Sequence, residues 1–141
     1  MDAGRVMLTR LRELTAQRKN VAFESTLASR TFAPWIRELR KTGYAFHLYY
    51  FWLPSADACV ERVYMRKSLG GHFVQEETIR RRYAAGVRNF FELYSPIAKN
   101  WHFYDNTDEP RRLIATGGVD LDETVPEREL WDTIKKEYED A

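Results

Sequence analysis

Two neighbouring predicted helices carry arginines that can bind an anion together. Arg66 ends the first helix, and Arg80, Arg81 and Arg82 lie in the second, beyond a turn at residues 69–72. The guanidinium group suits phosphate because its planar donors bind two oxygens at once and it keeps its charge. Successive helical residues are turned about 100° apart, so one or two of the three consecutive arginines can face a given cleft. The pattern indicates a phosphate-binding arginine cluster; the alternative is a solvated basic helix face.

A carboxylate and two hydroxyls form a second candidate group. Glu24, Ser25 and Thr26 come directly after residues 21–23, a short apolar run that predicts a buried strand. These side chains can exchange hydrogen bonds with a sugar or another hydroxyl-bearing substrate. In the alternative reading they are structural, and Ser25 or Ser29 only caps the helix that follows.

The elements that would position these groups follow from hydrophobic spacing and turn residues. The predicted helices span about residues 5–18, 32–39, 56–66 and 75–94 and begin again near 127, and the predicted strands are 21–23, 44–53, 101–104 and 113–115. Ser55 is predicted to cap the third helix. Because helices and strands alternate, we expect an α/β fold of three layers, with a parallel sheet covered on both faces. Ligands bind such sheets at the carboxyl ends of the strands, where Asp105 and Asn106 also lie.

The composition predicts one domain in a reducing compartment. The chain has 141 residues, 44% hydrophobic and 30% charged, which is ordinary for a globular protein. Cys59 is its only cysteine, so no disulfide forms within the chain. The longest apolar run, residues 44–53, is too short to cross a bilayer, so we expect a cytoplasmic protein without a membrane partner. The formal net charge of +1 disfavours a nucleic-acid partner.

Several familiar catalytic patterns are missing from the sequence. The phosphate-binding loop G-x-x-x-x-G-K-[ST] does not occur, and the nearest fragment is Lys67-Ser68. His47, His72 and His102 lack the spacing of metal ligands, so no metal site is predicted. His72, beside two glycines, can bind phosphate when it is protonated, or it is a structural turn residue.

Four segments in order carry a resemblance to a known family. They read VAFESTLASRT, GYAFHLYYFWL, RVYMRKSLGGHFVQEETIRRRY and NFFELYSPIAKNWHFYDN. Together they resemble the zeta-toxin-like P-loop kinases, most nearly the branch labelled predicted ABC-type ATPase, over residues 3–117. The resemblance implies a nucleotide-kinase-like fold. It also implies phosphoryl transfer from ATP, with Mg²⁺, to a nucleotide sugar such as UDP-N-acetylglucosamine or another small hydroxyl substrate.

The resemblance also implies roles for individual residues. Position by position, Glu24 and Thr26, with Ser25 between them, match the motif that holds the nucleotide-sugar substrate. Arg66, and Arg80 or Arg81, match arginines that reach the transferring phosphate. The segment Tyr104, Asp105 and Asn106 resembles the loop near the adenine.

The sequence departs from the family pattern in three places. Gln75 stands where the family usually has proline, and Ala28 stands where the toxins have a substrate-site arginine. Arg30 is the nearest basic residue and becomes the candidate in its place. Family chains also begin with a strand, the phosphate loop and an aspartate thought to be the catalytic base, and these have no counterpart here.

The chain is therefore expected to be a single zeta-toxin-like domain at residues 1–141, truncated at its N-terminus and missing the first strand. Alone, it should not bind ATP well or transfer phosphate. The missing strand would leave open edges, so we expect the other strands to pair across the gap, or a second chain to fill it.

Three other hypotheses remain. The chain is half of an enzyme completed by a separate phosphate-loop polypeptide, or a non-catalytic module that binds a partner such as an antitoxin, or an RNA-binding fragment that uses residues 80–82.

Overall fold

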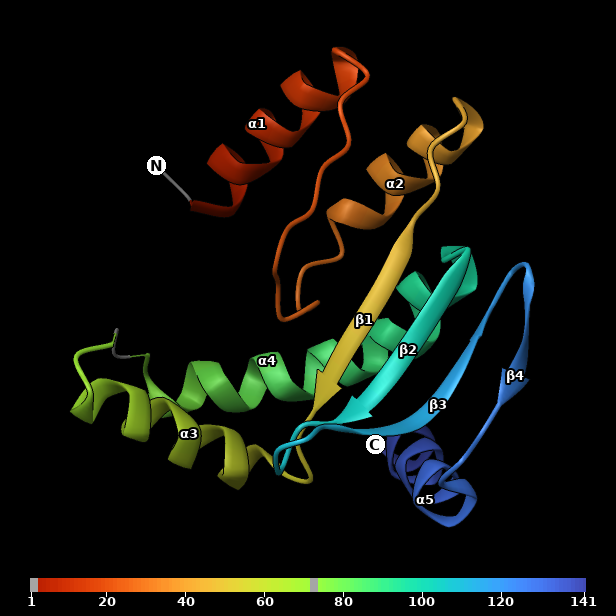
Figure 1. Cartoon of the computed structure of the whole chain (residues 1–141). Coiled ribbons are helices and arrows are strands. Elements are labelled where there is room, and N and C mark those ends of the chain that lie inside the picture. The colour runs from red at the N-terminus through yellow and green to blue at the C-terminus, as the bar shows by residue number, and fades with distance from the viewer. Residues whose placement is uncertain (1–2, 72–73) are drawn as a thin grey trace.

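The protein, described by a computed structural model at residues 3–71 and 74–141, folds around a four-stranded sheet. The strands are β1 (His47–Trp52), β2 (Asn100–Asp105), β3 (Arg112–Gly118) and β4 (Leu121–Thr124), in the spatial order β1-β2-β3-β4. β1 and β2 are parallel, whereas the β2–β3 and β3–β4 pairs are antiparallel. Figure 1 shows β1 at one edge of the sheet and the β3–β4 hairpin at the other.

The helices follow the predicted spacing closely. They are α1 (Ala3–Ala16), α2 (Phe32–Lys41), α3 (Ala56–Ser68), α4 (Glu76–Asn89) and α5 (Arg128–Asp140). α4 continues into a π-helical turn, Phe90–Tyr94, and a 3₁₀ turn, Ser95–Ile97, so the long helix predicted for residues 75–94 changes type near its end. A bilayer-crossing helix would need a longer apolar stretch than any helix offers in the described part of the chain.

The predicted cap of α3 is confirmed. Ser55 has an extended backbone, and its Oγ accepts a hydrogen bond from the Ala58 amide at 3.1 Å. This bond satisfies one of the amides that a helix start leaves without a partner.

Replacing Ser55 by alanine should therefore lower the free energy of unfolding by about 1 kcal/mol. Urea denaturation followed by far-UV circular dichroism measures the change. Ser68→Ala, at the exposed end of the same helix, is the matched control and should change stability by less than about 0.5 kcal/mol. Equal effects for the two variants would contradict a capping role.

The expectation of an all-parallel sheet is wrong, because β3 runs antiparallel to β2. Only residues 106–111 connect these two strands, and a parallel connection needs a crossover of a dozen or more residues. β3 contains the predicted strand at residues 113–115 and continues through Gly117 and Gly118, which were expected to end it. β4, which was not predicted, completes the hairpin.

The predicted first strand, at residues 21–23, is also wrong. Residues 19–26 have no regular secondary structure and pair with no strand in the described chain. Phe23 instead packs against α2, with its ring centroid 5.0 Å from that of Phe32 and 6.3 Å from that of Trp35. The segment and β1 therefore do not pair across the gap, which overturns that part of the expectation.

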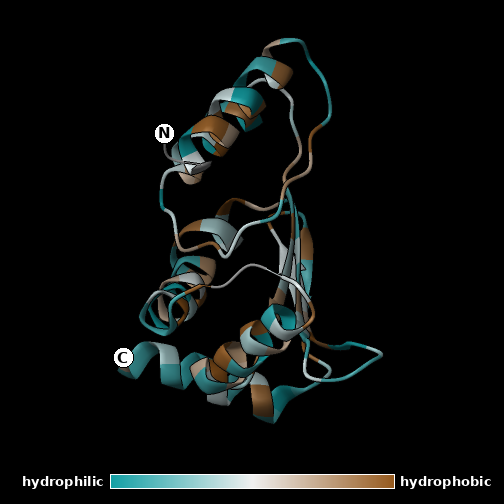
Figure 2. Cartoon of the chain, turned by 90° about the vertical axis from the view of Figure 1, so that its left-hand side faces the viewer, coloured by the Kyte–Doolittle hydropathy of each residue, from teal (hydrophilic) through white to brown (hydrophobic). Residues whose placement is uncertain are grey.

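Aromatic rings fill the core on one face of the sheet. Phe90 of the π-helical turn lies 5.5 Å from Trp101 and 5.0 Å from Phe103, centroid to centroid. Trp131 of α5 stacks on Trp101 at 5.5 Å and meets Phe103 edge-on at 5.0 Å. Figure 2 shows the sheet nearly edge-on with the helices gathered on this side.

The opposite face of β1 is open. Its residues alternate between exposed and buried, so Leu48 and Trp52 face the core, while Tyr49 and Phe51 keep 55% and 48% of their surface exposed. The strand expected at residues 44–53 is therefore confirmed as β1, but the expectation that it is buried on both faces is wrong. The alternation of helices and strands predicted cover on both faces. In the described chain, the helices lie on one side of the sheet (Figure 2).

Candidate functional site

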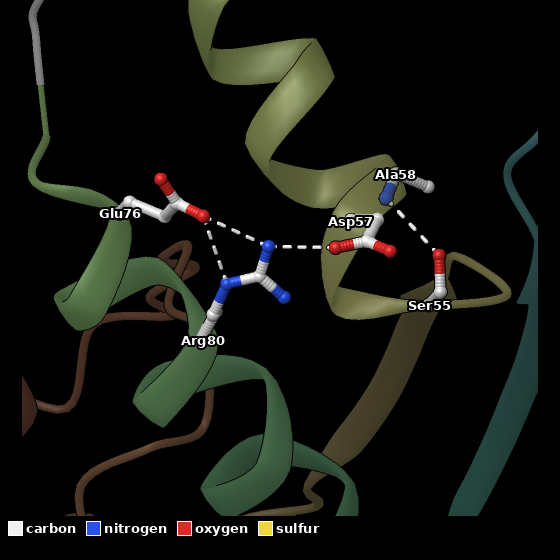
Figure 3. A network of polar contacts seen from close by, with 5 residues as sticks. All are labelled: Ser55, Asp57, Ala58, Glu76 and Arg80. Atoms are coloured by element: carbon white, nitrogen blue, oxygen red, sulfur yellow. Dashed lines mark hydrogen bonds and ion pairs between the residues drawn. The ribbon is translucent and has the colours of Figure 1, made fainter.

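Arg80 joins the two arginine-bearing helices through carboxylates. Its Nη2 lies 2.6 Å from Oδ1 of Asp57 on α3 and 2.9 Å from Oε1 of Glu76, one turn earlier on α4 (Figure 3). The hydrogen bonds to Asp57 and then to Glu76 raise the pKa of Arg80 above its ordinary value. Arg80 is thus in the predicted inter-helix region, but two carboxylates already accept hydrogen bonds from its Nε and Nη2.

The other predicted arginines are exposed. Arg66 lies in the last turn of α3, and Arg81 and Arg82 lie on the solvent side of α4. In the part of the chain that the structure describes, no hydrogen bond or ion pair joins the Arg66 side chain to Arg80 or Glu24. His72, in the turn between α3 and α4, lies outside the described residues.

The predicted substrate residues lie in a loop whose hydroxyls close local turns. Ser25 Oγ accepts a hydrogen bond from the Leu27 amide at 2.8 Å, and Thr26 Oγ1 accepts one from the Ala28 amide at 3.3 Å. Ser29 Oγ does the same for the Thr31 amide. The structural alternative therefore explains why these hydroxyl oxygens accept hydrogen bonds from backbone amides. The hydroxyl protons stay available to a ligand.

Two α4 residues that the sequence analysis missed seat this loop on the arginine-bearing helix. A Cβ at Gly86 would lie 2.3 Å from the Thr26 carbonyl oxygen, so the helix and loop backbones are in close contact. Asn89, 1% exposed, donates from Nδ2 to the carbonyl oxygens of Leu27 at 2.8 Å and Ala28 at 3.1 Å. A glycine and an amide on the buried side of a helix are the sequence signals that predict such a contact.

Arg30 follows the same loop and is exposed. Beside it, the Tyr94 hydroxyl donates to the Ser29 carbonyl oxygen at 2.5 Å, which fixes the loop to the π-helical turn. Burial raises the pKa of Tyr94, and the nearby charge of Arg30 opposes that rise. Arg30 is thus positioned next to the loop that holds Glu24, which is also exposed.

The predicted adenine-side residues form a braced loop at the end of β2. Asp105 Oδ1 accepts hydrogen bonds from the amide and hydroxyl of Thr107. The carbonyl oxygen of Asn106 accepts from Arg62 Nη1 of α3 at 2.9 Å, and its amide donates to the Trp52 carbonyl at 2.8 Å. These contacts fix the loop to α3, the helix that carries Arg66.

Tyr104 points to the open face of the sheet. Its ring stacks against Phe51 of β1 with centroids 5.7 Å apart, and Arg111 covers Phe51 with its guanidinium carbon 4.5 Å from the ring centroid. Tyr104 therefore belongs to an aromatic surface that includes β1.

The titratable side chains of Tyr50, Cys59 and Tyr83 lie close together. Burial raises the pKa of Tyr50 well above its ordinary value, and burial also raises the pKa of Cys59. Burial, and then the charge of the Cys59 thiolate, raise the pKa of Tyr83 from 10.0 to about 12. The Tyr83 hydroxyl donates to the Leu53 carbonyl oxygen at 2.9 Å. The folded state therefore holds these protons more tightly than the unfolded chain.

The shift of Tyr83 should make the protein sensitive to alkali. Its pKa is higher in the folded state, so its contribution to stability is complete below pH 10 and is lost as the pH rises from 10 to about 12. Tyr83→Phe should flatten the decline of the unfolding free energy across this range. Urea titrations at successive pH values test this. Parallel curves for wild type and Tyr83→Phe would contradict it.

The residues do not supply a cradle for ATP and Mg²⁺. The sequence lacks the loop whose amides would surround the β- and γ-phosphates. Within the described ranges, no group of three or more histidine, cysteine or acidic side chains is arranged to hold a metal ion. The described residues include arginines and hydrogen-bonding groups that can contact an anion.

Comparison with protein-family models, curated proteins and solved structures yields no match.

Proposed function

We propose that this chain is the acceptor-substrate and arginine side of an ATP-dependent phosphotransferase of the zeta-toxin-like P-loop kinase type. The proposal rests on the resemblance of its four sequence segments to that family. One structural observation supports it most: the loop at residues 24–29 is seated on α4 through Gly86 and Asn89. The candidate substrate loop is thus in direct contact with the helix that carries Arg80 and Arg81.

In this proposal the candidate residues have different roles in substrate binding. Glu24 and the protons of the Ser25 and Thr26 hydroxyls would hold the hydroxyl groups of a nucleotide sugar such as UDP-N-acetylglucosamine. Arg66 and Arg81, exposed and without a carboxylate partner in the described chain, would bind its phosphates. Asp57 and Glu76 would hold the Arg80 guanidinium in place. Arg80 would contact a phosphate only after that phosphate displaces one of the two carboxylates. A phosphate loop from another polypeptide segment would have to deliver ATP, so the isolated chain would be inactive.

Calorimetry with UDP-N-acetylglucosamine, and separately with ATP and Mg²⁺, tests this proposal. We expect measurable binding of the sugar nucleotide and no micromolar binding of ATP. Arg66→Gln and Arg81→Gln should each weaken sugar-nucleotide binding by about tenfold or more, since hydrogen bonds between charged groups are the strong ones. Arg82→Gln, on the same helix, is the matched control and should not. Micromolar affinity for ATP, or sugar-nucleotide binding that ignores Arg66 and Arg81, would overturn the proposal.

A second candidate is a non-catalytic binding module. The carboxylate pairing of Arg80 favours it, because the arginine most central to the helix pair is already engaged (Figure 3). The use of the Ser25 and Thr26 hydroxyls in local turns also favours it. If neither nucleotide binds in calorimetry, this function replaces the first.

A further inference from the structure

A hollow of about 450 Å³ lies between the β3–β4 hairpin and α5. Only residues 125–127 connect β4 to α5, so the hairpin and the helix stay close together (Figure 1). The Trp131 indole of α5 donates from Nε1 to Oε1 of Glu123 on β4 at 3.1 Å, which ties the two elements to each other. The volume of the hollow is within the range of small-molecule sites, which is about 300–1,000 Å³.

Aromatic rings form the apolar part of this hollow. Trp101 and Trp131 both line it and stack on each other with their centroids 5.5 Å apart. Gly117 lets the Trp101 ring lie against the sheet, because a Cβ there would be 2.8 Å from Cζ2 of the indole. Val119 and Leu121 also line the hollow and are 54% and 41% exposed. A ligand in the hollow would therefore meet aromatic rings and cover two exposed aliphatic side chains.

Charged groups of both signs line the same hollow. Asp122 and Glu123 belong to β4, and Lys135 lies on α5, one helical turn after Trp131. The Lys135 ammonium nitrogen is 6.0 Å from the centroid of the Trp131 ring. Because Glu123 accepts the hydrogen bond of that same indole, a carboxylate and an ammonium group approach one tryptophan from two different elements.

These opposite charges do not neutralise one another. Across residues 3–71 and 74–141, no ion pair joins Lys135 to Asp122 or Glu123, and the Asp122 side chain makes no hydrogen bond. Elsewhere on α5, Arg128 and Asp132 are one turn apart and do form an ion pair, at 3.6 Å. The hollow therefore presents both kinds of charge to a ligand.

From these observations we infer that the hollow binds a free α-amino acid with a large apolar side chain, such as phenylalanine. The carboxylate of the amino acid would pair with Lys135, its ammonium group would pair with Asp122, and its side chain would lie on the indole rings. A neutral apolar ligand would leave all of these charges unmatched, and a simple amine would match only the carboxylates. A zwitterion matches both signs at once.

L-Phenylalanine, titrated into the isotope-labelled full chain, is the first probe. The indole N–H of Trp131 reports occupancy by NMR, because Trp131 lines the hollow and its N–H is bonded to Glu123. We expect a saturable shift of this resonance. Phenethylamine, which lacks the carboxylate, and phenylpropionate, which lacks the ammonium group, should each bind about fivefold or more weakly than phenylalanine. Glycine, which lacks the apolar side chain, should not bind.

Two charge variants assign the two ends of the ligand. Lys135→Gln should weaken phenylalanine binding by about fivefold or more, but should not weaken phenethylamine binding, because the amine has no carboxylate. Asp122→Asn should weaken the binding of phenylalanine and of phenethylamine, but not that of phenylpropionate. The matched controls are Lys136→Gln and Asp120→Asn, next to the two lining residues but outside the lining, and they should change none of these affinities.

Three results would overturn the inference. They are the absence of a saturable shift with phenylalanine, equal affinity for phenylalanine and both of its singly charged analogues, and phenylalanine binding that neither charge variant weakens. Neither Asp122 nor Lys135 is buried, so both variants should keep the backbone resonances of the wild-type core. The probes contain no phosphate or nucleotide, so this test is independent of phosphoryl transfer.

Discussion

Gly86→Ala is expected to destabilise the protein by about 1–3 kcal/mol, although alanine is the better helix former. Helix propensity alone predicts a gain of about 1 kcal/mol at an interior helical glycine. The new Cβ, however, would lie 2.3 Å from the Thr26 carbonyl oxygen, closer than real Cβ contacts occur. Because the neighbour is backbone, no side chain can rotate away, and the loop at residues 24–29 has to move.

Urea denaturation gives the stability change, and amide exchange at Leu27 and Ala28 reports whether the loop leaves α4. Both amides should exchange faster in Gly86→Ala. Ala84→Ser, on the exposed side of the same helix, is the control and should change stability by less than about 0.5 kcal/mol. A more stable Gly86→Ala variant would mean that the loop does not rest on the helix.

Trp131→Ala should cost about 3–5 kcal/mol, a large part of the stability of a domain of this size. Trp131 is 2% exposed and packs against Trp101, Phe103 and Phe90. Its Nε1 also donates to Glu123 at 3.1 Å, which ties α5 to β4. The truncated side chain would leave a cavity between α5 and the sheet and an acceptor without its donor.

Chemical denaturation monitored by near-UV circular dichroism measures this loss. Trp131→Phe keeps most of the ring volume and removes the hydrogen bond, so it separates the two contributions and should cost less than the alanine variant. A loss below about 1 kcal/mol for Trp131→Ala would show that α5 is not part of the core.

The helices could be predicted because their boundaries depend on local residues. Apolar spacing locates all five, and the Ser55 cap follows from one hydroxyl at the start of α3. The strands at β1, β2 and β3 were located, and β1 and β2 run parallel as expected, but the antiparallel direction of β3 was not predicted. Direction depends on the length of the connection, which is short between β2 and β3, and on pairing with distant residues.

The segment at residues 21–23 shows a different limit. A run of three apolar residues fits a strand equally well whether or not a neighbour exists to pair with it. The Phe23 side chain packs on α2, yet the backbone of the segment stays unpaired in the described chain. The apolar run therefore marks a segment that is partly buried at Val21 and Phe23, but it does not reveal whether the backbone pairs with a strand.

The candidate site was predictable in part for a similar reason. Glu76 lies one helical turn before Arg80, a spacing that predicts their ion pair. Asp57 is 23 residues earlier, on another helix, so no local spacing reveals it. The contacts of Gly86 and Asn89 with the loop at residues 26–28 likewise depend on the tertiary fold.

The π-helical turn at Phe90–Tyr94 limits the deletions that this part of the chain can accept. A turn of this type holds one residue more than an α-helical turn, and here Phe90 and Tyr94 are both almost completely buried. Deleting one residue would restore uniform winding, but it would rotate everything beyond it by about 100°. Tyr94 would then lose the Ser29 carbonyl that its hydroxyl binds. The extra residue therefore sets the orientation of Tyr94 relative to α4, so a one-residue deletion within Phe90–Tyr94 should destabilise the protein.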